Sequence, residues 1–360
     1  MVSLTDLHRD HGLSIWVDDL SRSMLNSGRL DELIASGVRG LTSNPAIFAS
    51  AMADADAYKD QFHALVSAGA SVEEAYWEMA VDDIRAACDR FADLYNASDG
   101  TDGFVSIEVD PRLAHDTNGT IAAGRALAAR VDRDNVMIKV PATEAGLDAI
   151  TALIGEGINV NVTLIFSLDR YAEVMEAHLK GLDIAAAAQR NLSRIAGVAS
   201  FFISRVDTEV DTRLGDGHPL RGTAALAQGR LAYRLFTATF TGQRWDALAE
   251  RGARPQRPLW ASTGTKDPAY SDVMYVDGLI GPLSVNTLPP ATLAAFTDHG
   301  TPQRTIDVDP DDTDRIWSAL AAAGIDMADV AQQLAERGVS AFVDSFDGIV
   351  ATLEAAAPST

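Results

Sequence analysis

The stretch GINVNVTLIFSLDRYAEVMEAHLKGL, residues 157–182, is the part of the sequence on which our fold prediction rests. Its first half alternates, so that Asn159, Asn161 and Thr163 fall on one face of a strand and apolar residues on the other. Ser167 then supplies an N-cap for a helix. Strands of a covered parallel sheet usually carry apolar side chains on both faces, so the polar face is unexpected. The stretch therefore predicts a strand followed by a helix. The polar face of that strand calls for an explanation.

The same order of strand, turn and helix recurs along the chain, and eight such units can be counted. The expected strands are Ser14–Asp18, Val38–Asn44, Phe104–Asp110, Val136–Val140, Asn159–Phe166, Ile195–Phe202, Pro258–Ser262 and Val273–Gly278. Eight units predict an α/β protein built as a single (β/α)8 TIM barrel. The alternative is an open doubly wound sheet, which is disfavoured because no GxGxxG motif follows the first strand.

Additional helices are expected beyond the eight of a minimal barrel. The long connections at residues 46–103 and 203–257 leave room for them, and Ser71 begins a capping-box pattern within the first connection. Further helices are expected at the C-terminus from about residue 311. No stretch has the composition of a linker, so we expect residues 1–360 to form one domain.

Composition and charge exclude several classes of protein. The chain has 360 residues, of which 47% are hydrophobic and 22% charged, as in a soluble globular protein. Its 29 Lys and Arg residues face 51 Asp and Glu residues, which gives a net charge of −22. A surface of this sign repels phosphate backbones and anionic lipid headgroups. We therefore expect a soluble enzyme with no nucleic-acid partner and no membrane partner.

Signals for export, membrane insertion and metal binding are missing from the sequence. Cys88 is the only cysteine and the N-terminal segment is polar, which favours a cytoplasmic protein without disulfides. No apolar run approaches the roughly 20 residues that span a bilayer. The seven histidines show no HxH or HExxH spacing, so no metal site is expected.

Polar residues gather near the ends of the expected strands. Inward positions at the carboxyl ends of barrel strands form the active site, so these side chains should converge. An isolated Asn or Ser at a strand end is often only a turn or helix cap, and Asp110 before Pro111 is interpreted as a turn residue. Glu108 and Lys139 differ from these strand-end residues, because a charged side chain in the middle of a covered strand is rarely buried without an ionic partner or a functional role.

Lys139 is notable because lysine is scarce in this chain. Only four lysines occur, and the other 25 of the 29 cations are arginines. An arginine would serve if position 139 needed only a positive charge, whereas lysine alone offers a nucleophilic amine. Its apolar neighbours in VMIKVP, residues 136–141, disfavour the charged form and favour attack on a carbonyl to form a Schiff base. Glu108 could then shuttle protons, although a buried Lys139–Glu108 ion pair is the alternative interpretation.

These residues lie in segments that resemble the transaldolase family. GLTSNPAIF at residues 40–48 and MIKVPATEAGL at residues 137–147 resemble its two long signatures, the second of which contains the Schiff-base lysine. Three further matching segments follow in the same order, and they are SIEVD at 106–110, GINVNVTLIFS at 157–167 and WASTGTK at 260–266. The resemblance covers residues from about 14 to 300 and is strongest to the longer bacterial, actinobacterial-type branch.

The resemblance implies a reversible transfer of a dihydroxyacetone unit from sedoheptulose 7-phosphate or fructose 6-phosphate to glyceraldehyde 3-phosphate or erythrose 4-phosphate, within the non-oxidative pentose phosphate pathway. Lys139 would form the Schiff base. Glu108 would act through a water held by Thr163, and Asp18 would exchange the proton of the C4 hydroxyl. The protonated imine is itself the electron sink, so no metal and no organic cofactor is implied. Such relatives occur as monomers or larger assemblies, and a monomer or homodimer is expected.

The resemblance also implies the residues that bind the substrate. Asn44 and Asn161 would bind hydroxyls of the dihydroxyacetone unit, and Ser200 would bind its terminal hydroxyl. Arg205 and Lys266 would bind the phosphate. Two positions depart from the family pattern, because Ser200 is followed by phenylalanine where many relatives have proline, and Lys266 stands where other branches use arginine.

Two other functions stay open at this point. An aldolase of the same superfamily would release free dihydroxyacetone, but such relatives are shorter and tend to lack a glutamate at position 108. A non-catalytic barrel could instead bind sugar phosphates as a sensor, but Asp18, Glu108, Lys139 and Thr163 are all present.

Overall fold

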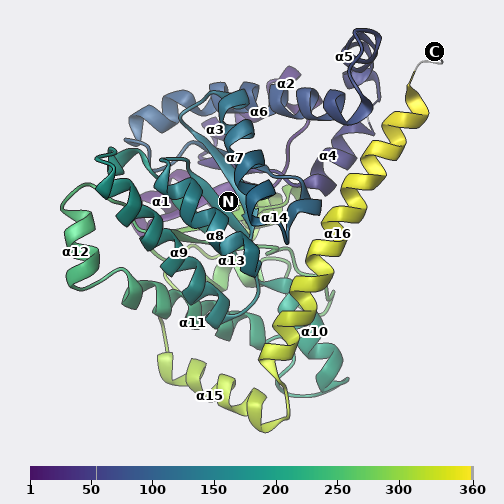
Figure 1. Ribbon diagram of the computed structural model, residues 1–360. Coiled ribbons are helices and arrows are strands. Elements are labelled where there is room, and N and C mark those ends of the chain that lie inside the picture. The colour runs from purple at the N-terminus through teal and green to yellow at the C-terminus, as the bar shows by residue number, and fades with distance from the viewer. Residues whose placement is uncertain (54, 358–360) are drawn as a thin grey trace.

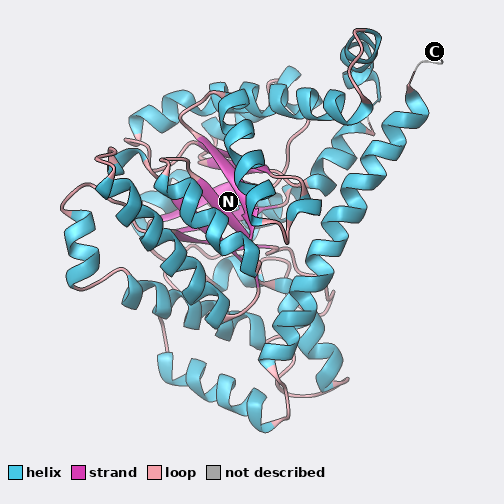
Figure 2. Ribbon diagram, viewed as in Figure 1, coloured by secondary structure: helices cyan, strands magenta, loops and turns pink. Residues whose placement is uncertain are grey.

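The computed structural model describes residues 1–53 and 55–357 and contains a closed barrel of eight parallel strands, paired in chain order from β1 to β8. Figures 1 and 2 show the strands at the centre and the helices packed around them. The strands are β1 Leu13–Val17, β2 Gly40–Thr42, β3 Phe104–Glu108, β4 Val136–Pro141, β5 Val160–Ile165, β6 Gly197–Phe202, β7 Arg257–Ala261 and β8 Ser284–Leu288. The predicted (β/α)8 TIM barrel is confirmed.

Helices cover the outside of the barrel and fill its long connections. The α-helices are α1 Leu4–His11, α2 Arg22–Asn26, α3 Arg29–Ala35, α4 Pro45–Met52, α5 Ala55–Ser67, α6 Val72–Ala97, α7 Thr117–Val131, α8 Glu144–Gly155, α9 Leu168–Ala187, α10 Ser204–Leu214, α11 Ala224–Thr239, α12 Gln243–Ala249, α13 Met274–Gly278, α14 Pro290–His299, α15 Pro310–Ala322 and α16 Met327–Ala356. Two 3₁₀ turns are η1 Pro111–Leu113 and η2 Leu192–Arg194. The additional helices expected in both connections and at the C-terminus are present. The described residues contain no helix that is long and apolar enough to cross a membrane.

Local signals explain where several helices begin. The Ser71 hydroxyl accepts a hydrogen bond from the amide of Glu74, whose carboxylate in turn accepts one from the amide of Ser71, so the predicted capping box is formed. Ser167 caps α9 in the same way, because its hydroxyl accepts from the amide of Arg170. Each cap satisfies backbone N–H groups that have no partner within the helix.

The predicted position of the eighth strand is wrong. Residues 273–278 form the short helix α13, and the strand is Ser284–Leu288, which pairs with β1 and β7. The apolar run around Tyr275 resembles a buried strand, whereas the true strand reads SVNTL and is mostly polar. Its polar side chains are buried, and Asn286, for example, accepts a hydrogen bond of 2.8 Å from Thr263. The composition of this segment therefore gave only a weak signal for a strand, because apolar and β-branched residues are the usual signal.

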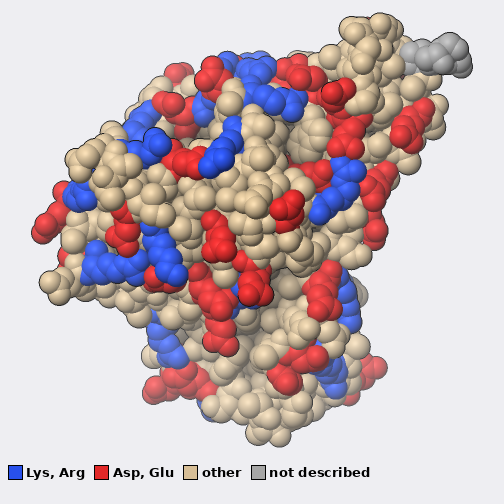
Figure 3. Space-filling view, in the orientation of Figure 1, with Lys and Arg blue, Asp and Glu red and all other residues tan. Residues whose placement is uncertain are grey.

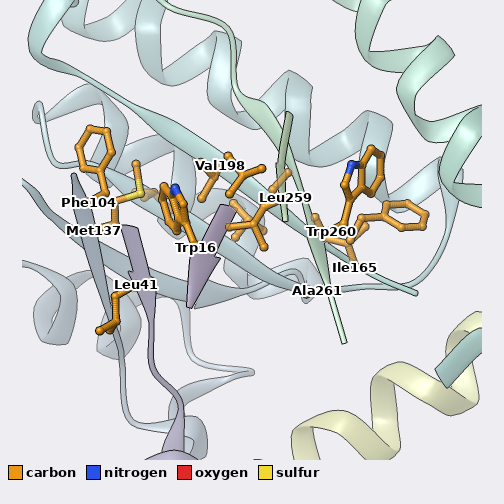
Figure 4. Packing of buried hydrophobic residues seen from close by; sticks show 14 of the residues in the cluster. Trp16, Leu41, Phe104, Met137, Ile165, Val198, Leu259, Trp260 and Ala261 are labelled. Atoms are coloured by element: carbon orange, nitrogen blue, oxygen red, sulfur yellow. The ribbon is translucent and has the colours of Figure 1, made fainter. Parts of the chain in front are cut away.

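Large apolar side chains fill the middle of the barrel below its carboxyl end. Trp16 points into the interior with Phe104, and their ring centroids are 6.4 Å apart (Figure 4). Gly40 makes this arrangement possible, because a Cβ at that position would lie 2.5 Å from the indole ring of Trp16. Since side chains alternate along a strand, Asp18 lies on the same face as Trp16 but nearer the carboxyl end. The apolar layer thus forms the floor beneath the polar residues.

A buried ionic network closes the amino end of the barrel. Asp102 has 1% of its surface exposed and accepts a hydrogen bond of 2.6 Å from Arg39 and one of 3.1 Å from Ser14. Arg257, the first residue of β7, pairs with the same carboxylate at 3.2 Å. Burial opposes ionisation of Asp102, but the charges of Arg257 and Arg39 outweigh it and keep the pKa of this carboxyl below its ordinary value.

We expect Asp102→Ala to destabilise the protein by about 3–5 kcal/mol, because it leaves two partly buried guanidinium groups without their shared counter-charge. Urea denaturation at neutral pH measures this change. The folded-state pKa lies below the unfolded value, so the network stabilises the protein above about pH 4 and loses this effect as the pH falls. Glu32→Ala, which removes an exposed partner of Arg29, is the control and should change stability little. An equally small change for Asp102→Ala would contradict this assignment.

The surface carries its charges in small mixed groups. On the face shown in Figure 3, basic side chains lie beside acidic ones and do not gather into one extended patch. Arg244 illustrates the pattern, since it contacts Glu176 at 2.7 Å and Asp183 at 2.9 Å. Surface arginines of this kind are neutralised locally by neighbouring carboxylates.

Candidate active site

A polar cavity of about 180 Å³ lies at the carboxyl end of the barrel. Seven of the nine predicted site residues line it, namely Asp18, Asn44, Lys139, Thr163, Ser200, Arg205 and Lys266. Glu108 and Asn161 do not line this cavity, but each contacts a residue that does. The seven residues that line the cavity come from six different strands or the segments that follow them, and closure of the barrel brings them together.

Strand register places the central charged pair. Glu108 of β3 pairs with Lys139 of β4 in the parallel ladder, and Lys139 pairs with Asn161 of β5. The three side chains therefore project at the same level into the barrel. The Nζ of Lys139 lies 3.4 Å from Oε2 of Glu108 and donates a hydrogen bond of 3.1 Å to the backbone carbonyl of Ser43. Both charged residues are buried, with 4% and 5% of their surfaces exposed.

Burial changes the protonation of both carboxyl groups near the lysine. Burial raises the pKa of Glu108 to about 7, against the lowering effect of the Lys139 charge, and Asp18 raises it further. Burial also raises the pKa of Asp18, while Lys139, a hydrogen bond from Thr42 and the charge of Arg205 act in the opposite direction. Glu108 can therefore both donate and accept a proton near neutral pH.

Asp18 is held by a threonine pair that the sequence prediction missed. The Thr42 hydroxyl donates to Oδ1 of Asp18 at 2.5 Å and lies 2.6 Å from the hydroxyl of Thr287. Both threonines line the cavity. Thr42 could have been found, because it precedes Asn44 by two positions on the same strand face. Thr287 could not, because its strand had been placed elsewhere.

Asn161 does not line the cavity but is hydrogen-bonded to Ser200, which does. Its side-chain amide donates to the Ser106 hydroxyl at 3.0 Å, and its Oδ1 accepts from the Ser200 hydroxyl at 2.7 Å. This chain crosses three strands and orients Ser200 toward the cavity that it lines. Thr163, by contrast, has a buried hydroxyl with no hydrogen-bond partner among the described residues. Its bonding capacity is free for a substrate or a water molecule.

Two strand-end residues serve as caps. Asn44 caps α4, since its Oδ1 accepts a hydrogen bond of 3.0 Å from the amide of Ile47, and it also lines the cavity. Asp110 accepts a hydrogen bond of 2.9 Å from the amide of Arg112 and begins η1. The interpretation of Asp110 as a turn residue is confirmed, whereas Asn44 has a structural contact in addition to its place in the cavity wall.

Arg205 and Lys266 bring positive charge to the cavity. Neither forms an ion pair with a carboxylate among the described residues, unlike most arginines of the surface. The guanidinium carbon of Arg205 lies 5.2 Å from the ring centroid of Phe202, which also lines the cavity. Burial lowers the pKa of Arg205, and the Asp18 carboxylate partly offsets this. Two cations in one cavity, neither of them ion-paired with a carboxylate of the described residues, are suited to bind an anion such as a phosphate.

The C-terminal helix also reaches the cavity, which the sequence prediction missed. Phe342 of α16 lines it, and the Nζ of Lys139 lies 5.8 Å from the centroid of the Phe342 ring. The helix runs along one side of the molecule in Figure 1, from α10 toward α5. Its sequence has helical periodicity, and periodicity does not distinguish a phenylalanine of the core from one in a site wall.

The arrangement is suited to covalent chemistry on a carbonyl. A buried amine lies beside a carboxyl that can exchange a proton near neutral pH, and a second carboxylate and two cations face the same cavity. Among the described residues, no group of three or more His, Cys, Asp or Glu side chains could hold a metal ion. Cys88 is buried in α6, and burial raises the pKa of its thiol, so it is a packing residue.

Known proteins of one family match almost the whole chain. A family model described as Transaldolase/Fructose-6-phosphate aldolase matches residues 15–353. The transaldolase of Saccharopolyspora erythraea is 51% identical over 355 residues, which cover 96% of this chain and 95% of that protein. The transaldolase of Thermobifida fusca is 53% identical over 348 residues, covering 95% of each chain. Transaldolase 1 of Streptomyces avermitilis is 57% identical over 297 residues, covering 81% of this chain and 79% of that protein. The expected resemblance to actinobacterial relatives is confirmed.

Proposed function

The chain belongs to the transaldolase/fructose-6-phosphate aldolase family, and from this membership we propose how its residues catalyse the reaction of that family. The activity is that of a transferase, which moves a dihydroxyacetone unit from sedoheptulose 7-phosphate or fructose 6-phosphate to glyceraldehyde 3-phosphate or erythrose 4-phosphate. The observation that carries our assignment of roles is the buried Lys139–Glu108 pair, whose Nζ and Oε2 atoms lie 3.4 Å apart, beside a cavity that Arg205 and Lys266 also line.

The first half of the reaction loads the donor onto Lys139. The amine of Lys139 attacks the C2 carbonyl of the ketose phosphate. Glu108 then gives a proton, through a water held by Thr163, to the C2 hydroxyl of the carbinolamine, which leaves as a second water. The pKa of Glu108, raised to about 7 by burial, supports this role. The buried hydroxyl of Thr163, which has no hydrogen-bond partner among the described residues, supports its assignment as the group that holds the water between Glu108 and the substrate.

The second half breaks and remakes the carbon–carbon bond. Asp18 takes the proton of the C4 hydroxyl, the C3–C4 bond breaks, and its electron pair moves into the protonated imine to give an enamine. The first aldose phosphate leaves and the acceptor aldehyde binds. C3 of the enamine then attacks that aldehyde, Asp18 returns the proton to the new hydroxyl, and water releases the product ketose from Lys139. The hydrogen bond from Thr42 supports a fixed position of Asp18 during both proton transfers.

The relatives favour transfer over simple release. Those named above are transaldolases, and they match the chain over most of their length. Measuring glyceraldehyde 3-phosphate release from fructose 6-phosphate, with and without erythrose 4-phosphate, tests this. Release that depends on the acceptor supports the transferase. Release that is independent of the acceptor would identify an aldolase, and a protein that binds the sugar without any release would be a sensor.

Phosphate binding by Arg205 and Lys266 gives a separate prediction. We expect Arg205→Ala and Lys266→Ala each to raise KM for fructose 6-phosphate by roughly 10- to 100-fold, because a hydrogen bond to a charged group contributes about 1.5–3 kcal/mol. With unphosphorylated fructose as the donor, steady-state kinetics should show little difference between either variant and the wild-type protein. Lys180→Ala, which removes an exposed lysine of α9, is the control. Equal losses with both sugars would contradict phosphate binding by these residues.

Three wider assignments belong to the same proposal. Residues 1–360 act as one domain, because α16 near the C-terminal end packs on α4, α6 and α10 and lines the cavity of the barrel. The polar N-terminal segment and the single cysteine support a cytoplasmic location. We assign a monomer or a homodimer, and sedimentation analysis measures which of the two exists.

A further inference from the structure

Two phenylalanines of α16 lie over the two residues that carry the covalent chemistry. Phe342 lines the cavity together with Lys139, whose Nζ lies 5.8 Å from the ring centroid. Phe346 lines a smaller neighbouring cavity together with Glu108 and Asn44. Residues four positions apart lie on the same face of a helix, so a single face of α16 presents both rings to the site. This helix lies outside the eight strand–helix units of the barrel.

Close packing holds α16 at this position. A Cβ at Gly338 would lie 2.9 Å from Leu164, so this glycine lets the helix approach the end of β5 directly. On the other side, Arg112 lies 4.7 Å from the ring centroid of Phe346, and Tyr76 of α6 packs edge-on against that ring at 5.2 Å. Phe342 is 6% exposed and Phe346 is fully buried. The two rings are therefore fixed parts of the site wall.

The proposed reaction makes such a wall useful. After the C3–C4 bond breaks, the enamine on Lys139 has two possible fates. In transfer, C3 attacks the acceptor aldehyde. In release, C3 takes a proton from water, a second water adds to C2 of the imine, and the C2–N bond breaks to give dihydroxyacetone and the free amine. Both fates end with hydrolysis of the imine, but only release needs a proton from water on C3. Keeping bulk water away from the enamine therefore slows the protonation of C3 and leaves its attack on the aldehyde unaffected.

We propose that Phe342 and Phe346 form a water-excluding wall over the Lys139–Glu108 pair, and that this wall favours transfer of the dihydroxyacetone unit over its release as free dihydroxyacetone. This inference rests on the proposed function, because it concerns the fate of an intermediate held on Lys139. It makes Phe342 and Phe346 specificity-determining residues contributed by a helix outside the barrel.

Phe342→Ala is the main test. With fructose 6-phosphate as donor, we expect the ratio of dihydroxyacetone release to transfer onto erythrose 4-phosphate to rise at least about fivefold. In D₂O, each released dihydroxyacetone should carry one deuterium at the carbon that was C3, and NMR measures how much of this labelled product forms for each transfer event. A higher yield reports protonation of the enamine by solvent, whereas a purely structural defect would lower release and transfer together.

Two further variants keep the test decisive. Val339→Ala is the matched control, because Val339 lies one turn away on α16 and lines a different groove. It should keep the wild-type ratio. Phe346→Leu retains most of the apolar volume and should give a smaller rise than Phe342→Ala. If Phe342→Ala does not fold, as judged by circular dichroism and its Tm, Phe342→Leu replaces it and should still raise the ratio.

The outcomes separate this inference from the proposed function. A wild-type protein that transfers dihydroxyacetone and is labelled at Lys139 by borohydride establishes the function. If the folded Phe342 variants then keep the wild-type ratio of deuterated dihydroxyacetone to transfer product, the water-excluding role is wrong while the function stands. If the wild-type protein shows neither transfer nor labelling, the proposed function itself fails.

Discussion

Lys139→Arg should abolish turnover, lowering kcat by about four orders of magnitude or more. Arginine retains the positive charge, but its guanidinium stays ionised and cannot form the imine. The coupled assay for glyceraldehyde 3-phosphate measures the loss of activity. Borohydride reduction in the presence of fructose 6-phosphate, followed by mass spectrometry of peptides, should label Lys139 in the wild-type protein and leave the variant unlabelled.

The matched control for this result is Lys180→Arg, which makes the same substitution at an exposed lysine of α9. It should retain both activity and labelling. The alternative interpretation, in which Lys139 serves only as the ionic partner of Glu108, predicts that Lys139→Arg keeps substantial activity because the ion pair survives. Retained turnover would therefore refute covalent catalysis at this position.

Glu108→Gln should lower kcat by roughly 10²- to 10⁴-fold, the range typical of a lost general acid–base group. Glutamine fits the same space but can neither donate nor accept the proton that moves during imine formation and release. Rapid-quench kinetics should show that formation of the reducible imine is the slowed step. An unchanged rate of imine formation would exclude Glu108 from that role.

The same variant has a pH-dependent signature in stability. The pKa of Glu108 in the folded protein is raised to about 7 from an ordinary 4.5, so the folded state holds this proton more tightly than the unfolded state does. The wild-type protein therefore loses stability as the pH rises from about 4.5 to 7, and Glu108→Gln lacks this contribution. The difference in Tm between variant and wild type should shift in favour of the variant over this range. Glu32→Gln, at an exposed position, should show no such shift.

The sequence was sufficient to predict the barrel and several of the residues that line its cavity, because both depend on alternation along strands. Lys139, Thr163 and Ser200 were found as polar residues at positions where a covered strand should be apolar, and closure of the barrel brings them together. Glu108 was found in the same way, and its contact with Lys139 follows from the register of β3 and β4. Residues that break the expected composition of their element carry the functional signal.

The same rule explains the failures. The eighth strand is so rich in polar residues that its composition no longer indicates a strand, and the apolar run of α13 was chosen in its place. Thr287 was therefore missed as a site residue. Phe342 was missed for the opposite reason, since an apolar residue on an amphipathic helix is expected to belong to the core. Only the tertiary position of α16 shows that its ring faces the lysine.

The ionic network at the amino end of the barrel has a consequence for the kinetics of folding. Asp102 and Arg257 are 155 positions apart in the chain, and Ser14 belongs to β1, which pairs with β8 only when the barrel closes. Contacts of such long range form late, after the entropic cost of loop closure has been met. Removing the Asp102 carboxylate should therefore accelerate unfolding far more than it slows refolding. The network therefore slows unfolding and prolongs the lifetime of the closed barrel.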